Sequence, residues 1–302
     1  MRRPQNGESS GEVNGLDLRT DLAVEAKRLW ENSAEEKTEL PGVAARKTLR
    51  RGIGLEKVVI LDERGAEALK KPVGTYLTVD LQSFTERERH CFRRTALVLA
   101  EALNDLLKPY TSVLVAGLGN REITPDAIGP HVLEHILVTR HLLERGKLPP
   151  GSLTPVSTIV PGVLGITGIE SVELVRSARR IVGADCVLVV DALASCEPDR
   201  LCRSVQLSDT GLVPGSGVGN CRPAFTEKEL GVPVYAVGVP TVVDGAPFLS
   251  REGVAADNAK ELIVTPRDID SRVREIGKLI GYGIDLAVQP KLNFDDIPSF
   301  LS

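Results

Sequence analysis

The stretch of sequence that decides the fold is 112–130, S-V-L-V-A-G-L-G-N-R-E-I-T-P-D-A-I-G-P, together with the long amphipathic run that follows it to residue 146. Residues 113–115 form a short, continuous apolar segment, which is typical of a strand covered on both faces. Gly117 and Gly119 end this strand and allow the backbone to turn tightly. Residues 186–191 form a second segment of the same kind. Two buried strands, each followed by a turn or a helix, predict a parallel sheet with right-handed crossovers.

An acid follows each of these two strands. Thr124 and Pro125 predict a helix start, with a capping hydroxyl and then a proline in the first turn, so Asp126 should lie in that turn. Asp191 ends the second strand. In open α/β sheets, ligands bind beyond the carboxyl ends of the parallel strands, so one crevice could hold both carboxylates. Either acid can also be structural, because helix dipoles and turns both favour acids at such positions.

The rest of the chain has the pattern of a single α/β body. A charged helical stretch runs to about residue 37, and the helix at 83–107 should open with overlapping capping boxes at 83–86 and 85–88. We expect a three-layer α/β/α fold around a mostly parallel sheet, in one domain. Further strands are expected at 55–62, 74–81, 157–160 and 234–243, and helices at 83–107, 169–182 and 265–288.

Composition excludes several classes of function. The 302 residues carry a net charge of -4, which gives no basic face for nucleic acid. No apolar run is long enough to cross a membrane, and the polar N-terminus lacks the apolar core of a signal peptide. The five cysteines show no C-x-x-C spacing, so neither a disulfide framework nor a cysteine zinc site is indicated. We expect a cytoplasmic protein with reduced thiols and no membrane partner.

Two glycine-rich loops resemble nucleotide-binding loops only in part. The loop at 117–120 follows a strand, but the third glycine of a dinucleotide fingerprint is missing. The loop at 214–220 lacks the Lys-Ser/Thr pair of a phosphate-binding loop. We expect both loops to bring the backbone close to a groove at the active site. The residues in question are Gly117, Gly119, Asn120, Gly215, Gly217, Gly219 and Asn220.

Two short motifs suggest other peptidase chemistries. Residues 131–135 read H-V-L-E-H, and on a helix His131 and His135 could hold zinc while Glu134 acts as a base. Both histidines lie about 100° from the buried stripe of that helix, so they can equally be boundary residues. Residues 209–211 read D-T-G, the tripeptide of pepsin-like proteases, but those need two copies on an all-β fold. A turn is the simpler interpretation of the single copy.

Several ordered segments together resemble the germination proteases of endospore-forming bacteria, and the resemblance covers nearly the whole chain. The family is one of endopeptidases that degrade small acid-soluble spore proteins. The matching segments are R-T-D-L-A at 19–23, G-L-G-N at 117–120, T-P-D-A-I-G-P at 124–130, P-G-V at 161–163, D-A-L-A at 191–194, P-G-S-G-V-G-N at 214–220 and V-P-T-V-V-D at 239–244.

The resemblance implies an atypical aspartic endopeptidase without a cofactor, whose catalytic acids are Asp126 and Asp191. It also implies a zymogen that removes its own leader, a homotetramer, and a place in the cytoplasm of the forespore, the later spore core. The family fold is similar to that of hydrogenase maturation endopeptidases. Their metal-binding acids match the same two positions, but their histidine ligand has no match here, so we assign no metal.

The resemblance also gives the N-terminal segment a role. Family substrates have a threonine and an acid, then an apolar residue, alanine, any residue and glutamate, and the cut follows the acid. Residues 20–25, T-D-L-A-V-E, fit this pattern. We therefore predict self-cleavage between Asp21 and Leu22, which divides the chain into a mobile propeptide, 1–21, and a peptidase domain, 22–302. The same residues can also form an ordinary helix start, with Thr20 as the cap.

For the chemistry, we expect Asp126 to act as the base that activates water and Asp191 as the proton donor. Two alternatives stay open. One is a metal-dependent peptidase, with zinc at His131 and His135 or with nickel or zinc at the two acids. The other is a binding module without catalytic activity.

Overall fold

A computed structural model describes residues 20–33, 40–219, 222–244 and 262–301. In these residues the core is a nine-stranded sheet in the order β1-β2-β3-β7-β8-β6-β4-β5, with β9 paired to β8. The strands are β1 (Val43–Arg50), β2 (Ile53–Ile60), β3 (Gly74–Asp80), β4 (Val113–Gly117), β5 (Val156–Ile159), β6 (Cys186–Ser195), β7 (Ser204–Ser208), β8 (Val234–Asp244) and β9 (Ile263–Val264).

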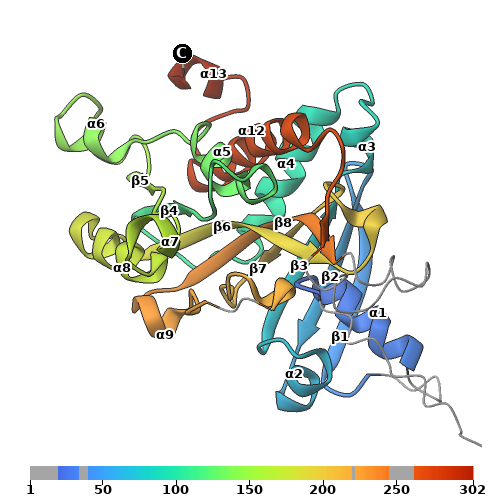
Figure 1. The fold of residues 1–302 in the computed structure, drawn as a ribbon. Coiled ribbons are helices and arrows are strands. Elements are labelled where there is room, and N and C mark those ends of the chain that lie inside the picture. Colours follow the sequence, from blue (N-terminus) through green and yellow to red (C-terminus); the bar gives the residue numbers. More distant parts are fainter. Residues whose placement is uncertain (1–19, 34–39, 220–221, 245–261, 302) are drawn as a thin grey trace, which may run out of the picture.

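Helices cover both faces of this sheet (Figure 1). One face packs under α4, α5 and α12, and the other packs under α8 and α9 beside β4 and β6 and under α1 and α2 beside β2 and β3. The α-helices are α1 (Ala23–Ser33), α2 (Glu63–Leu69), α3 (Gln82–Thr85), α4 (Cys91–Asn104), α5 (Ile128–Leu133), α6 (Arg140–Glu144), α7 (Leu164–Thr167), α8 (Ser171–Val182), α9 (Glu227–Leu230), α12 (Ile269–Val288) and α13 (Ile297–Leu301).

The expected three-layer α/β fold in a single domain is confirmed, and its sheet is mixed. The strands β5, β4, β6 and β8 are parallel neighbours, whereas β1, β2, β3, β7 and β8 pair antiparallel in that order. The continuous apolar runs of β4 and β6 are buried along their whole length, as strands covered on both faces should be. No helix in the described part of the chain is long and apolar enough to cross a membrane.

Three local expectations were wrong. The helix expected at 83–107 is two helices, and α4 starts at Cys91 with no side-chain cap, so the capping boxes do not form. The amphipathic run to residue 146 is likewise split into α5 and α6. Thr124 is not a cap, because residues 124–126 form a separate 3-10 turn, η1 (Thr124–Asp126), whose cap position is Ile123.

Candidate active site

Asp126 lies in η1, which follows the carboxyl end of β4. The loop between them holds its side chain, because the backbone N–H of Asn120 donates to Asp126 Oδ2 at 2.8 Å. Gly119 has a φ of +100°, and a Cβ there would come within 1.9 Å of the carbonyl oxygen of Asp126. A Cβ on Gly117 would come within 2.0 Å of Leu133 Cδ1. Gly119 therefore lets the loop wrap closely around Asp126, and Gly117 lets α5 pack close to the end of β4.

Asp191 lies inside β6 and not at its end, because the strand continues to Ser195. The expectation that it ends its own strand was wrong. Its neighbour Val190 pairs with Gly117, the last residue of β4, so Asp191 is the first residue of β6 beyond that shorter strand. On the other side Asp191 pairs with Gly238 of β8. The Asp191 side chain is 5% exposed.

Burial shifts the pKa of both predicted acids, and the charge of Asp126 also acts on Asp191. Burial raises the pKa of Asp191 well above its usual value, and the nearby charges of Asp126 and Asp21 raise it further, although a hydrogen bond from the N–H of Ala192 opposes this. Burial also raises the pKa of Asp126, and the hydrogen bond from Asn120 lowers it in part. Of these two acids, Asp191 therefore holds a proton more strongly than Asp126.

Asp21, the residue before the predicted cut, binds to β6 beyond Asp191. Its N–H donates to the carbonyl oxygen of Ala194 at 2.9 Å, and the Ala194 N–H donates to Asp21 Oδ2 at 2.8 Å. The Ser216 hydroxyl donates to Asp21 Oδ1 at 2.5 Å. Gly217 closes this acid pocket, which we define as the Ala194 N–H, Ser216 and Gly217 around the Asp21 carboxylate.

The bond between Asp21 and Leu22 is held on both sides by one residue of β7. Gln206 Nε2 donates to the carbonyl oxygen of Asp21 at 3.0 Å, and the N–H of Ala23 donates to Gln206 Oε1 at 2.7 Å. Leu22 itself is 0% exposed and packs against Leu193 and Val24. The predicted processing site thus joins a half-buried Asp21 to a fully buried Leu22, and hydrogen bonds hold the segment on both sides.

The residues on either side of this bond are also bound. Glu25 is 0% exposed, and its carboxylate accepts hydrogen bonds from the Ser195 hydroxyl at 2.5 Å and the Cys196 N–H at 2.8 Å. Lys71 donates to the carbonyl oxygen of Thr20 at 3.2 Å. Burial lowers the pKa of Lys71, and the charges of Asp21 and Glu25 oppose that shift. Glu25 lies in the first turn of α1, which begins at Ala23, three residues after Thr20.

The second glycine-rich loop builds one wall of the acid pocket. Gly215 and Gly219 adopt φ of +72° and +74° and flank the 3-10 turn η3 (Ser216–Val218). Their left-handed conformations turn the chain sharply, and this aims the Ser216 hydroxyl at Asp21. Asn220 and residues 1–19 of the expected leader lie outside the described residues.

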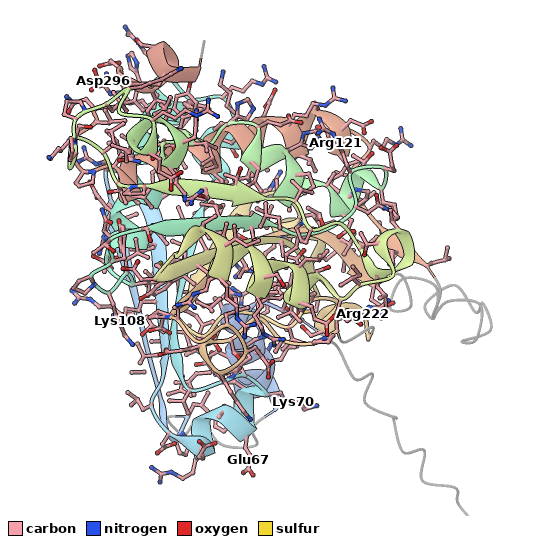
Figure 2. All side chains as sticks on the ribbon, turned by 90° about the vertical axis from the view of Figure 1, so that its left-hand side faces the viewer. Glu67, Lys70, Lys108, Arg121, Arg222 and Asp296 are labelled. Atoms are coloured by element: carbon pink, nitrogen blue, oxygen red, sulfur yellow. The ribbon has the colours of Figure 1, made fainter. Side chains whose placement is uncertain are left out.

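Both glycine-rich loops lie at one end of the molecule. Figure 2 shows Arg121, which follows the first loop, and Arg222, which follows the second, at the end toward which β4 and β6 point. This is the end at which open α/β sheets bind ligands.

The two other motifs take no part in this site. The helix α5 ends at Leu133, so His131 and His135 do not lie on one helix, and their Cβ atoms pack against Gly277 and Gly281 of α12. His131 Nδ1 lies 3.2 Å from Glu134 Oε2. Among the described residues, no three His, Cys, Asp or Glu side chains are placed to share a metal ion.

The D-T-G motif is a bend after β7, as the turn interpretation predicts. Asp209 Oδ1 accepts a hydrogen bond from the N–H of Thr75 at 2.7 Å, which ties this bend to β3.

Sequence reasoning missed the polar residues that hold the segment 20–25, above all Gln206, Ser216 and Lys71. A signal for Gln206 exists, because it stands between the buried apolar residues Val205 and Leu207 in a short strand. A polar residue in a strand buried on both faces needs a partner. The identity of that partner, 185 residues away along the chain, cannot be read from the pattern.

Comparisons with known proteins agree on one family. The family model of germination proteases matches residues 22–252. The germination protease of Caldanaerobacter subterraneus subsp. tengcongensis is 41% identical over 95% of this chain and 98% of that protein. That of Clostridium tetani is 39% identical over 95% of this chain and 100% of its own length. That of Bacillus cytotoxicus is 41% identical over 77% of this chain and 65% of that protein.

A solved structure, the [NiFe] hydrogenase maturation protease HycI of Thermococcus kodakarensis, aligns with 61% of this chain and 98% of its own at 14% identity, with a TM-score of 0.34. The assignment rests instead on the family model and on the sequence relatives, which cover most of the chain. The chain therefore belongs to the germination protease family and is a protease of spore germination.

Proposed function

We propose that this protein is an aspartic endopeptidase made as a zymogen, which cuts itself between Asp21 and Leu22 and then degrades small acid-soluble spore proteins. One observation carries the proposal. Asp21, the residue before the predicted cut, is bound close enough to Asp191 for its charge to raise the pKa of Asp191. The charge of Asp126 raises the pKa of Asp191 as well. This proximity supports a role for the bond after Asp21 as the first substrate of the two acids.

In the mechanism that we propose, Asp126 is ionised and Asp191 is protonated. Two unit charges about 4 Å apart repel by about 4 kcal/mol at an effective dielectric near 20, so such a pair holds one proton at neutral pH. The oxygen of a water molecule attacks the carbonyl carbon of Asp21, and the water proton passes to Asp126. Asp191 gives its proton to the nitrogen of Leu22 as the carbon–nitrogen bond breaks.

The pockets that hold residues 20–25 also support the substrate class. The acid pocket accepts a carboxylate, the Leu193 surface accepts an apolar side chain, and the Ser195 hydroxyl and Cys196 N–H accept a glutamate at the position of Glu25. A substrate segment with the same order of residues fits the same pockets once the leader has left and residues 22–25, the new N-terminus, have withdrawn from them. From the family resemblance we further propose a homotetramer that acts in the spore core, and sedimentation analysis of the intact chain tests the assembly.

The direct test is to follow the purified full chain by N-terminal sequencing and mass spectrometry, with and without a chelator. We expect a new N-terminus at Leu22, followed by cleavage of the added peptide T-E-I-A-S-E after its first glutamate. No cut under any condition would leave a binding module as the function. Loss of cleavage in the chelator, with rescue by zinc or nickel, would establish the metal-dependent alternative.

A further inference from the structure

The position of Gln206 in β7 directs its side chain to the same face of the sheet as Asp191. Its neighbours Val205 and Leu207 belong to the core under α4 and α12, and Val190 belongs to the same core. Successive residues of a strand face opposite sides, so Gln206 and Asp191 both lie on the other face. Each of them pairs with Gly238 of β8, one from either side, so the two stand about 10 Å apart across that glycine.

The orientation of the Gln206 amide follows from its partners. The N–H of Ala23 can only donate, so the atom it meets is the oxygen Oε1, and the carbonyl of Asp21 can only accept, so it meets the Nε2 group. The two bonds fix the side chain at both ends. Gln206 is also 8% exposed, and hydrogen bonds are electrostatically stronger where water is excluded.

We propose that Gln206 is a catalytic residue that polarises the carbonyl of the scissile bond and stabilises the negative oxygen formed when water attacks. This inference rests on the proposed cut between Asp21 and Leu22. As the carbonyl carbon becomes tetrahedral, its oxygen gains negative charge, and the Nε2 hydrogen already points at it. Gln206 neither gains nor loses a proton in the step.

The second bond of Gln206 gives it a role in substrate positioning. By accepting from the N–H of Ala23, the side chain holds the second residue after the cut as well as the residue before it. Leu22 lies between these two residues, so its orientation relative to the Asp21 carbonyl is fixed. A group that is already in place when charge develops needs no reorganisation during the reaction, which is why such donors accelerate it.

The test is the first-order rate of self-cleavage in the full chain, measured as the appearance of the Leu22 N-terminus. Two variants are used. Gln206→Met keeps the length of the side chain and removes both hydrogen bonds, and Gln206→Glu keeps the acceptor and removes the donor. We expect both to slow the cut by about 10²–10³-fold, the usual effect of removing one oxyanion donor.

The chain offers a matched control in Gln289, which is also buried and also bonds both ways to one backbone segment. Its Nε2 donates to the Thr154 carbonyl at 2.8 Å and its Oε1 accepts from the Thr154 N–H at 2.8 Å. Gln289→Met should lose comparable stability but keep the rate of self-cleavage. Docking of the leader is followed by hydrogen exchange at the N–H of Asp21, with the uncut Asp191→Asn chain as the docked reference.

The proposal is supported if the Gln206 variants are cut slowly while the Asp21 N–H stays protected. It is overturned if either variant is cut at the original rate, if Gln289→Met slows the cut equally, or if protection is lost in proportion to the rate. An unsubstituted chain that is never cut refutes the proposed function itself, and the role of Gln206 falls with it. These outcomes separate the two claims.

Discussion

Gly217 lies so close to the carboxylate of Asp21 that a Cβ on it would come within 2.4 Å of Asp21 Oδ2, and within 2.6 Å of the Cβ of Ala194. The acid pocket therefore has no room for a side chain at position 217 beside the Asp21 carboxylate. Its size admits a carboxylate only because residue 217 has no side chain.

Gly217→Ala should slow self-cleavage by about 5- to 150-fold, which corresponds to an overpacking cost of about 1–3 kcal/mol in the docked state. The added methyl group would push Asp21 out of the acid pocket. The measurement is the rate at which the Leu22 N-terminus appears. Gly165→Ala is the control, because a Cβ there meets nothing within 4 Å. Equal rates for the two variants would mean that the acid pocket does not select the residue before the cut.

Asp126→Asn and Asp191→Asn should each abolish self-cleavage and cleavage of the added peptide, with a loss of at least about 10²–10⁴-fold, because proton transfer needs both groups. Asn has nearly the shape of Asp, so the fold should persist. Mass spectrometry of aged full chain gives the uncut fraction.

Asp209→Asn is the matched control for these two variants. Its Oδ1 can still accept from the N–H of Thr75, so this acid of the D-T-G bend should be dispensable. Near-normal cleavage by Asp126→Asn or Asp191→Asn would remove that acid from the mechanism.

The double variant His131→Ala, His135→Ala should cut itself at the original rate, both with and without a chelator. Alanine retains the Cβ atoms that pack against Gly277 and Gly281, so α5 and α12 should stay together. The readout is again the new N-terminus, with circular dichroism to check folding. A folded but inactive double variant would show that these histidines are needed after all.

Asp285 makes stability depend on pH. Burial raises the pKa of its carboxyl group to about 7, against a hydrogen bond from the N–H of Leu137. The folded chain thus keeps a proton that the unfolded chain releases near pH 4. The contribution of this proton to the free energy of unfolding is complete below pH 4 and is lost as the pH rises through 7. The free energy of unfolding should fall by about 4 kcal/mol over that window, at 1.36 kcal/mol per pKa unit.

Asp285→Asn should remove this part of the pH dependence and make the chain relatively more stable at pH 8. Chemical denaturation at pH 4.5 and pH 8 measures it. Asp270→Asn, an exposed acid in the first turn of the same helix, should leave the dependence as it was. If the Asp285 variant shows the same pH dependence as the unsubstituted chain, this carboxyl group is ionised in the folded state.

Prediction from sequence succeeded where burial leaves a local pattern. The strands β4 and β6 are continuous apolar runs, and β2, β3 and β8 were placed within a few residues. The strand β1 was missed because most of its side chains are exposed, so its polar sequence does not alternate as a half-buried strand does. Capping patterns failed because tertiary contacts, and not the local chain, set where α4 and α5 begin.

The sequence pointed to two candidate acids but not to the residues that hold the segment before and after the predicted cut. Strand ends and the family resemblance pointed to Asp126 and Asp191, whose catalytic role stays a prediction, and the charge of Asp126 raises the pKa of Asp191. Gln206 reaches the site only because β7 lies antiparallel between β3 and β8, a long-range pairing that no local signal specifies. The same pairing places the two hydrogen bonds of Gln206 on either side of Leu22.

The half-buried position of Asp21, close enough to Asp191 to raise its pKa, implies that the proposed cut is irreversible. Once the bond is broken, Asp21 carries a second, terminal carboxylate next to its own side chain, in a site that already holds Asp126 and Asp191. Like charges that are shielded from water repel strongly, so the released leader is expelled and not rebound. The bond then does not re-form, and the acid pocket that Asp21 leaves is open to the acid of a substrate.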